Sequence, residues 1–127
     1  MKMKTRMLFV LSFLVVFSGA ALAETTEIVH FKSKAGVSSS QLVSSAKHME
    51  KTMYAWNGFI SRELIDLGNG EWIDVVHWES VDAANKAAEA EAKSEICLSF
   101  FALIEDSQVK TYRGDRVLLQ RAIPAKH

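Results

Sequence analysis

A three-residue turn, Gly68-Asn69-Gly70, separates two segments that are rich in β-forming residues. Glycine and asparagine accept the positive φ angles that a tight hairpin turn requires. The flanking segments, Phe59 to Leu67 and Trp72 to Trp78, are therefore predicted to be neighbouring antiparallel strands. This hairpin limits the possible folds strongly, because the remaining elements have to pack around it.

A strand and a helix are predicted before the hairpin. Glu27 to Lys32 has the alternation and the β-forming residues of a strand. Ser38 and Gln41 have the spacing of a capping box at the start of a helix. The helix carries apolar residues spaced to share one face: Leu42, Ala46, Met49, Met53 and Trp56. Asn57-Gly58 is predicted to end it, because both residues tolerate a left-handed turn.

A second helical region is predicted after the hairpin. Ser80 has the position of an N-cap for a helix from Val81 to about Lys93, whose many alanines allow close packing. Ser94-Glu95 predicts a break before a second apolar segment, Ile96 to Ile104. Together these features place one interrupted helical region between the hairpin and the C-terminal part of the chain.

Val109 to Leu119 is predicted to be the last strand, bent or bulged at Gly114. The resulting order, β-α-β-β-α-β, is that of the α+β ferredoxin-like fold, an antiparallel four-stranded sheet with two helices on one face. Both faces of the strand from Trp72 to Trp78 carry large apolar side chains. We therefore expect a homodimer in which two sheets cover one another.

The N-terminal segment is typical of a secretory leader. Lys2, Lys4 and Arg6 precede an apolar run from Leu8 to Phe17, and Ala21-Leu22-Ala23 has the pattern of a cleavage site. The run is shorter than the roughly 20 residues that span a membrane, although an uncleaved anchor is the alternative. We expect a signal peptide of residues 1–23, a periplasmic or secreted domain of residues 24–122, and a short polar tail of residues 123–127.

Charge and cysteine content exclude several classes of protein. The chain has 15 Lys and Arg and 15 Asp and Glu, and removal of the basic leader residues makes the mature part acidic. No basic stripe predicts nucleic-acid binding, and no membrane association is expected after cleavage. Cys97 is the only cysteine, so no internal disulfide is possible. A buried, inert thiol is the simpler interpretation of Cys97, and a reactive thiol is the alternative.

Three segments carry a resemblance to a known family. Asn57 to Leu64 resembles the "PGFIS-x-x-L" segment of antibiotic-biosynthesis-monooxygenase-like proteins, and Trp72 to Ser80 resembles their third strand, which ends in "W-x-S". Ile96 to Ile104 is similar to the end of the second helix in an uncharacterised exported branch of that family. The resemblance implies a dimeric α+β barrel. It also implies a range of functions: cofactor-independent oxygenation of polycyclic phenols, haem degradation, or no known activity.

Departures from the family's pattern argue against haem chemistry, and no cofactor is expected because the sequence carries no cofactor fingerprint. The haem-degrading relatives use an asparagine on the first strand and a tryptophan and a histidine on the second helix. Here the first strand offers Val29 and His30, the helix offers alanines, and Cys97 stands near the position of the histidine. The histidine found there in many of the oxygenases is missing as well. We therefore expect neither haem degradation nor tight haem binding.

Three residues are candidates for catalysis. His30 and His77 are predicted to lie on the two central strands, where a histidine can act as a base or simply hold one hydrogen bond. Asp74 lies between aromatic and apolar neighbours, where it can act as an acid or base, or it can pair with Arg62 across the hairpin. No metal site is expected, because no His-x-His or His-Glu-x-x-His spacing is present.

Several aromatic residues are candidates for binding a flat ligand, with core packing as the alternative. The candidates for ligand binding are Trp56, Trp72, Phe101, Tyr112 and Cys97. Trp78 and Phe100 are expected in the core, and His48 is expected in solvent. Two functions follow: a monooxygenase-like enzyme acting on a small aromatic compound, or a non-catalytic module that binds a small ligand or serves as a structural dimer.

Overall fold

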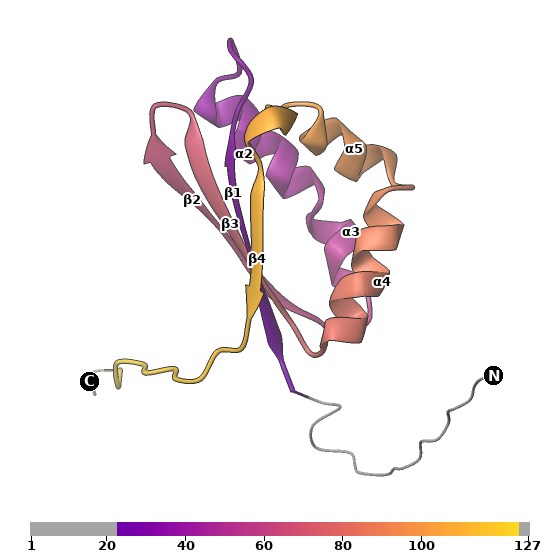
Figure 1. Cartoon of the computed structure of the whole chain (residues 1–127), viewed down its shortest axis with the longest axis vertical. Coiled ribbons are helices and arrows are strands. Elements are labelled where there is room, and N and C mark those ends of the chain that lie inside the picture. Colours follow the sequence, from indigo (N-terminus) through magenta and orange to yellow (C-terminus); the bar gives the residue numbers. More distant parts are fainter. Residues whose placement is uncertain (1–22, 125–127) are drawn as a thin grey trace, which may run out of the picture.

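The computed structural model describes residues 23–124, so the predicted leader up to Leu22 lies outside the described residues. Four antiparallel strands form one sheet: β1 (Thr25–Lys32), β2 (Phe59–Gly68), β3 (Glu71–Trp78) and β4 (Lys110–Gly114). Their order across the sheet is β2-β3-β1-β4. Figure 1 shows the helices gathered on one face of this sheet. The predicted α+β ferredoxin-like class is confirmed.

The helices follow the predicted order but are divided more finely. They are α2 (Ser39–His48), α3 (Glu50–Tyr54), α4 (Val81–Glu91), α5 (Glu95–Phe101) and a short 3-10 helix, η1 (Asp106–Gln108). The predicted first helix is interrupted at Met49, whose backbone N–H bonds to Ala46 three residues back, a tighter turn than the α-helix uses. In the described part of the chain no helix has both the length and the apolar character needed to cross a membrane.

Capping residues fix the helix starts that the sequence indicates. The Ser38 hydroxyl accepts the backbone N–H of Gln41, and the Gln41 side chain accepts the backbone N–H of Ser38, so the predicted capping box is confirmed. The hydroxyls of Ser80 and Ser94 cap α4 and α5 by accepting the backbone N–H groups of Ala83 and Cys97. The break between α4 and α5 therefore lies at Ser94, whose hydroxyl competes for the hydrogen bonds of nearby backbone groups.

The alternation of β3 determines where the core lies. Trp72, Val76 and Trp78 point to the helices and are buried, together with Asp74. The other alternate residues of β3, including Ile73 and Val75, are only half-buried. The helices add Leu42, Met49, Met53, Ala84, Ala87, Cys97 and Phe100 to the core. A single hydrophobic core thus fills the space between the sheet and the helices.

The last strand is shorter than expected. β4 ends at Gly114 rather than at Leu119, and residues 115–124 have no regular secondary structure. Gly114 pairs with Thr26, the second residue of β1. Residues after Gly114 therefore run past the start of β1 and have no strand residues beside them with which to pair. Val117 and Leu118 beyond it are exposed.

The face of the sheet opposite the helices carries apolar side chains that no other element of the described residues covers. Ile28 on β1 lies directly between Val75 on β3 and Tyr112 on β4, and Ile65 on β2 lies opposite Ile73. Ile28, Ile65 and Tyr112 are exposed. We call this surface the open face.

Candidate functional site

A cavity of about 230 Å³ lies between the sheet and the helices, and we call it the inner cavity. Its lining comes from all four strands and from the helices: Glu27, Val29, Phe31, Met49, Met53, Arg62, Asp74, Val76, Glu91, Phe100, Phe101, Ile104 and Thr111. Thr111 is exposed on β4 and lines the cavity, which places its mouth beside that edge strand. An apolar cavity of about 150 Å³ holds benzene, so this one has room for a small aromatic molecule.

Aromatic side chains form one wall of the inner cavity. The ring of Phe100 meets the ring of Phe31 edge to face at 6.0 Å between centroids, and it meets Phe101 at the same distance. Both pairs have the geometry that aromatic rings prefer. This part of the lining is therefore apolar and aromatic.

Arg62 and Asp74 form the polar part of the lining, next to the ring of Phe100. Arg62 donates from Nε to Oδ1 of Asp74 over 2.9 Å and from Nη2 to Oδ2 over 2.7 Å. Its third nitrogen, Nη1, donates to the carbonyl oxygen of Ala46 over 3.4 Å, and the guanidinium carbon lies 5.0 Å from the centre of the Phe100 ring. This bidentate pair confirms the predicted ion pair across the hairpin and occupies both oxygens of Asp74.

Glu91, the last residue of α4, is the cavity carboxylate without a partner. Its side chain has no hydrogen bond or ion pair with any of the residues that the structure describes. Burial, above all, raises the pKa of Glu91 to about 7, and the negative charge of Glu27 adds to this, while the positive charge of Arg62 acts in the opposite direction. A carboxylate with this pKa can take up and release a proton near neutral pH.

Glu27, by contrast, forms an ion pair with Arg113. Arg113 on β4 donates to Oε2 of Glu27 over 3.2 Å and to Oδ1 of Asn85 on α4 over 2.6 Å. This bridge ties β1, β4 and α4 together beside the mouth of the cavity. Of the three acidic residues in the lining, only Glu91 forms no ion pair with another residue of the described part of the chain.

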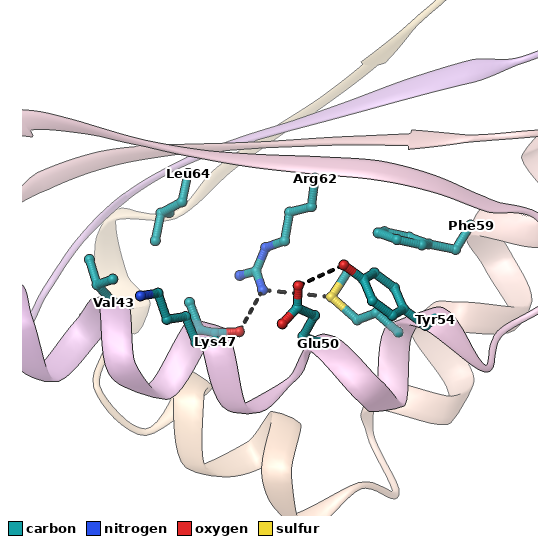
Figure 2. A pocket seen from close by; sticks show the side chains of 9 residues that line it. Val43, Lys47, Glu50, Tyr54, Phe59, Arg62 and Leu64 are labelled. Carbon is teal, nitrogen blue, oxygen red and sulfur yellow. Dashed lines mark hydrogen bonds between the residues drawn. The ribbon is translucent and has the colours of Figure 1, made fainter.

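A second cavity, of about 270 Å³, lies on the other side of Arg62 between β2 and the helices α2 and α3; we call it the outer groove. Figure 2 shows Arg62 extending from β2 toward the helix, with Val43 and Leu64 on one side and Tyr54 and Phe59 on the other. The hydroxyl of Tyr54 donates to Glu50 over 2.6 Å. That hydrogen bond raises the pKa of Tyr54. Met53 and Arg62 line both cavities.

The structure separates the three predicted catalytic residues. His30 and His77 lie on the central strands β1 and β3, as predicted, but on the open face, away from the inner cavity. His30 Nε2 lies 3.0 Å from a carboxylate oxygen of Glu71, and His77 Nδ1 lies 3.0 Å from the hydroxyl of Thr26. Only Asp74 faces the inner cavity.

Of the five predicted ligand-binding residues, Phe101 lines the inner cavity. Trp72 is buried in the core, and Trp56 stacks on Trp78 with 6.3 Å between ring centroids. Tyr112 lies exposed on the open face. Cys97 is fully buried in the core, and burial raises the pKa of its thiol, as expected of an inert cysteine. Trp78 and Phe100 are buried and His48 is exposed, as predicted.

Sequence reasoning missed Glu91. A signal was present in the sequence: Ala84, Ala87 and Glu91 have the spacing of one helix face, and the two alanines are buried. A carboxylate that continues a buried stripe of small residues is a candidate for an interior site. No group of three or more histidine, cysteine or acidic side chains with the geometry of a metal site occurs within residues 23–124.

Comparison with known proteins identifies the fold. No family model matches the sequence, and no curated protein matches it either. Among solved structures, SnoaB, a cofactor-independent oxygenase from Streptomyces nogalater, is similar with a TM-score of 0.62 at 13% identity, over 76% of this chain and 95% of that one. The fold is that of the antibiotic-biosynthesis-monooxygenase-like proteins.

Two further solved structures are similar to this chain. A candidate antibiotic biosynthesis monooxygenase from Bordetella bronchiseptica has a TM-score of 0.62 at 15% identity, over 76% of this chain and 99% of that one. Rv0793 from Mycobacterium tuberculosis has a TM-score of 0.54 at 18% identity, over 80% of this chain and all of that one. At these identities the likeness concerns the fold.

Proposed function

We propose that this chain is a monooxygenase-like enzyme that acts, without a cofactor, on a small aromatic compound held in the inner cavity. The observation that carries the proposal is Glu91, a carboxylate with a pKa of about 7 that has no hydrogen-bond or ion-pair partner within residues 23–124 and lines the same cavity as Phe100 and Phe101. The fold supports it, because SnoaB is described as a cofactor-independent oxygenase.

The chemistry needs a base, a dry pocket and a substrate that can give electrons to dioxygen. Glu91 would accept the proton of a ring hydroxyl, and the resulting anion would reduce dioxygen. One oxygen atom then enters the product, and the other leaves as water with two hydrogens of the substrate. Asp74 would not serve as the base, because Arg62 occupies both of its oxygens.

The test is oxygen uptake with naphthol as the substrate probe, followed by mass spectrometry of the product after reaction under isotopically labelled dioxygen. The proposal predicts labelled product from the wild type, and a loss in kcat of about a hundredfold or more in Glu91→Gln. The matched control is Glu89→Gln, an exposed residue on the same helix, which should keep the wild-type rate. Equal rates in both variants would exclude Glu91 as the base.

A non-catalytic ligand-binding module is the second candidate. It is favoured by the position of His30 and His77, which lie on the open face and leave the cavity without a histidine. In that case the inner cavity would retain a small apolar molecule without changing it. Native mass spectrometry of protein purified from its own host would then find a ligand at one per chain, and no oxygen uptake would accompany binding.

We also propose that the working form is a homodimer in which the open faces of two chains meet. The support is the uncovered row of Ile28, Val75 and Tyr112, which a second sheet would remove from water. Export to the periplasm or the medium is a further proposal, supported by the leader pattern before Glu24. N-terminal sequencing of exported protein should begin at Glu24, and retention of Met1 would contradict cleavage.

A further inference from the structure

Arg62 lies between two cavities. It lines both the inner cavity, of about 230 Å³, and the outer groove, of about 270 Å³. Met53 is the other residue that the two linings share. Figure 2 shows the guanidinium of Arg62 reaching the helix and so standing across the space between β2 and that helix.

The position of this side chain is fixed from several directions. Asp74 binds two of its nitrogens. The third donates to the carbonyl oxygen of Ala46 on α2 and contacts the sulfur atoms of Met49 and Met53 at 3.5 and 3.6 Å. The Arg62 and Asp74 side chains are only 12% and 11% exposed. A ligand that pushed Arg62 aside would leave Asp74 buried without its counter-ion, and this is costly in a protein interior.

We propose that Arg62 sets the upper size limit of the ligand, so that the inner cavity accepts a one-ring or fused two-ring aromatic compound and excludes a three-ring one. The inference rests on the proposed function in taking the inner cavity as the ligand site. A cavity of about 150 Å³ already holds benzene. The inner cavity adds room for about one more ring, and the space on the far side of Arg62 is the outer groove.

The test compares binding of phenol, naphthol and phenanthrol, which have one, two and three rings, by isothermal titration calorimetry. Wild-type protein should bind the first two and not phenanthrol. The variant Arg62→Met/Asp74→Asn removes both charges together, so that no carboxylate is left unpaired. It should bind phenanthrol at least about tenfold more tightly than wild type does, as expected from the additional apolar surface buried.

Val43 provides the matched control, because it lines the outer groove and not the inner cavity. Added to the double variant, Val43→Trp should fill the outer groove and abolish the gain in affinity for phenanthrol. Made alone in the wild-type chain, it should leave the affinity for naphthol unchanged. A folded double variant with wild-type affinity for phenanthrol would overturn the proposal. A gain that survives Val43→Trp would overturn it as well.

A second variant decides the question if the double variant does not fold. Arg62→Lys keeps the charge beside Asp74 but is shorter and lacks the planar fork, so it should also gain affinity for phenanthrol, and no gain would overturn the size limit. A different result would contradict the proposed function: wild-type protein that binds neither phenol nor naphthol would show that the inner cavity is not the ligand site. The phenanthrol comparison between variants would still decide the role of Arg62.

Discussion

Arg62 and Asp74 lie diagonally across the β2–β3 hairpin, with Nε to Oδ1 at 2.9 Å and Nη2 to Oδ2 at 2.7 Å. In the strand register Arg62 is opposite Val76, and Asp74 is opposite Leu64. The two side chains therefore reach one another along the face that the helices cover. The pair lines the inner cavity, and Arg62 also joins the hairpin to α2 through the carbonyl oxygen of Ala46.

The first prediction concerns the stability that this pair provides. Asp74→Ala should lower the free energy of unfolding by about 3–5 kcal/mol, because Arg62 is then left buried without its counter-ion. Urea unfolding followed by circular dichroism measures the change. The exposed pair Lys86–Asp82 on α4 is the control, and Lys86→Ala should cost less than about 0.5 kcal/mol. Similar losses in both variants would contradict the role of the buried pair.

The second prediction concerns pH. The pKa of Glu91 is raised from 4.5 to about 7 in the folded protein, so between these values the folded state holds a proton that the unfolded state has released. The free energy of unfolding should therefore fall as the pH rises through this window. Glu91→Gln should lack this fall and should be more stable than wild type above neutral pH by about 1–3 kcal/mol.

Urea unfolding at a series of pH values checks this second prediction. Glu89→Gln, which changes an exposed carboxylate on the same helix, should keep the wild-type pH dependence. If the profiles of wild type and Glu91→Gln run parallel, Glu91 does not titrate inside the protein as described.

The third prediction concerns the turn that leads into β2. Gly58 and Gly36 both have a φ of +86°, but a Cβ at Gly58 would lie 2.5 Å from the Cβ of Ala83 on α4, whereas nothing lies within 4 Å at Gly36. Gly36→Ala should cost about 1 kcal/mol for the backbone conformation alone. Gly58→Ala should cost about 2 kcal/mol more, because the hairpin and α4 must move apart. Equal losses in thermal unfolding would show that this close approach is unimportant.

The fourth prediction concerns the open face. Ile28→Lys places a charge at the centre of the surface on which we propose that two chains meet. A sheet-to-sheet interface of this kind buries about 2,000 Å² or more, and an unpaired charge within it should convert dimer to monomer. Light scattering after gel filtration measures the mass. Leu98→Lys, an exposed position on α5, should remain dimeric; a wild-type monomer at micromolar concentration would contradict the proposal.

Much of the fold could be predicted because local and long-range signals agree. The residues of Gly68-Asn69-Gly70 all have positive φ angles, so a hairpin turn was the natural prediction. The alternation of β3 divided its side chains correctly between the two faces of the sheet, although it did not indicate which face the helices cover. The end of β4 could not be predicted from residues 115–119 themselves. It depends on where β1 begins, because β1 supplies the residues with which β4 pairs.

The site was less accessible to sequence reasoning than the fold. His30 and His77 were attractive because they lie on central strands, but strand position does not say which face holds a cavity. Asp74 was found because its pairing with Arg62 is local to the hairpin. Glu91 comes from a helix distant in sequence, and its pKa depends on burial against strands that only the assembled structure brings together.

The central claim is that Glu91 titrates near neutral pH inside a cavity that binds small aromatic molecules. Carbon NMR of the glutamate side-chain carboxyl groups, with Glu91 assigned from the spectrum of Glu91→Gln, tests this most directly. The account predicts a titration midpoint near 7 for Glu91 and a shift of its resonance when naphthol is added. A midpoint near the ordinary value of 4.5, with a resonance that naphthol leaves unchanged, would contradict it.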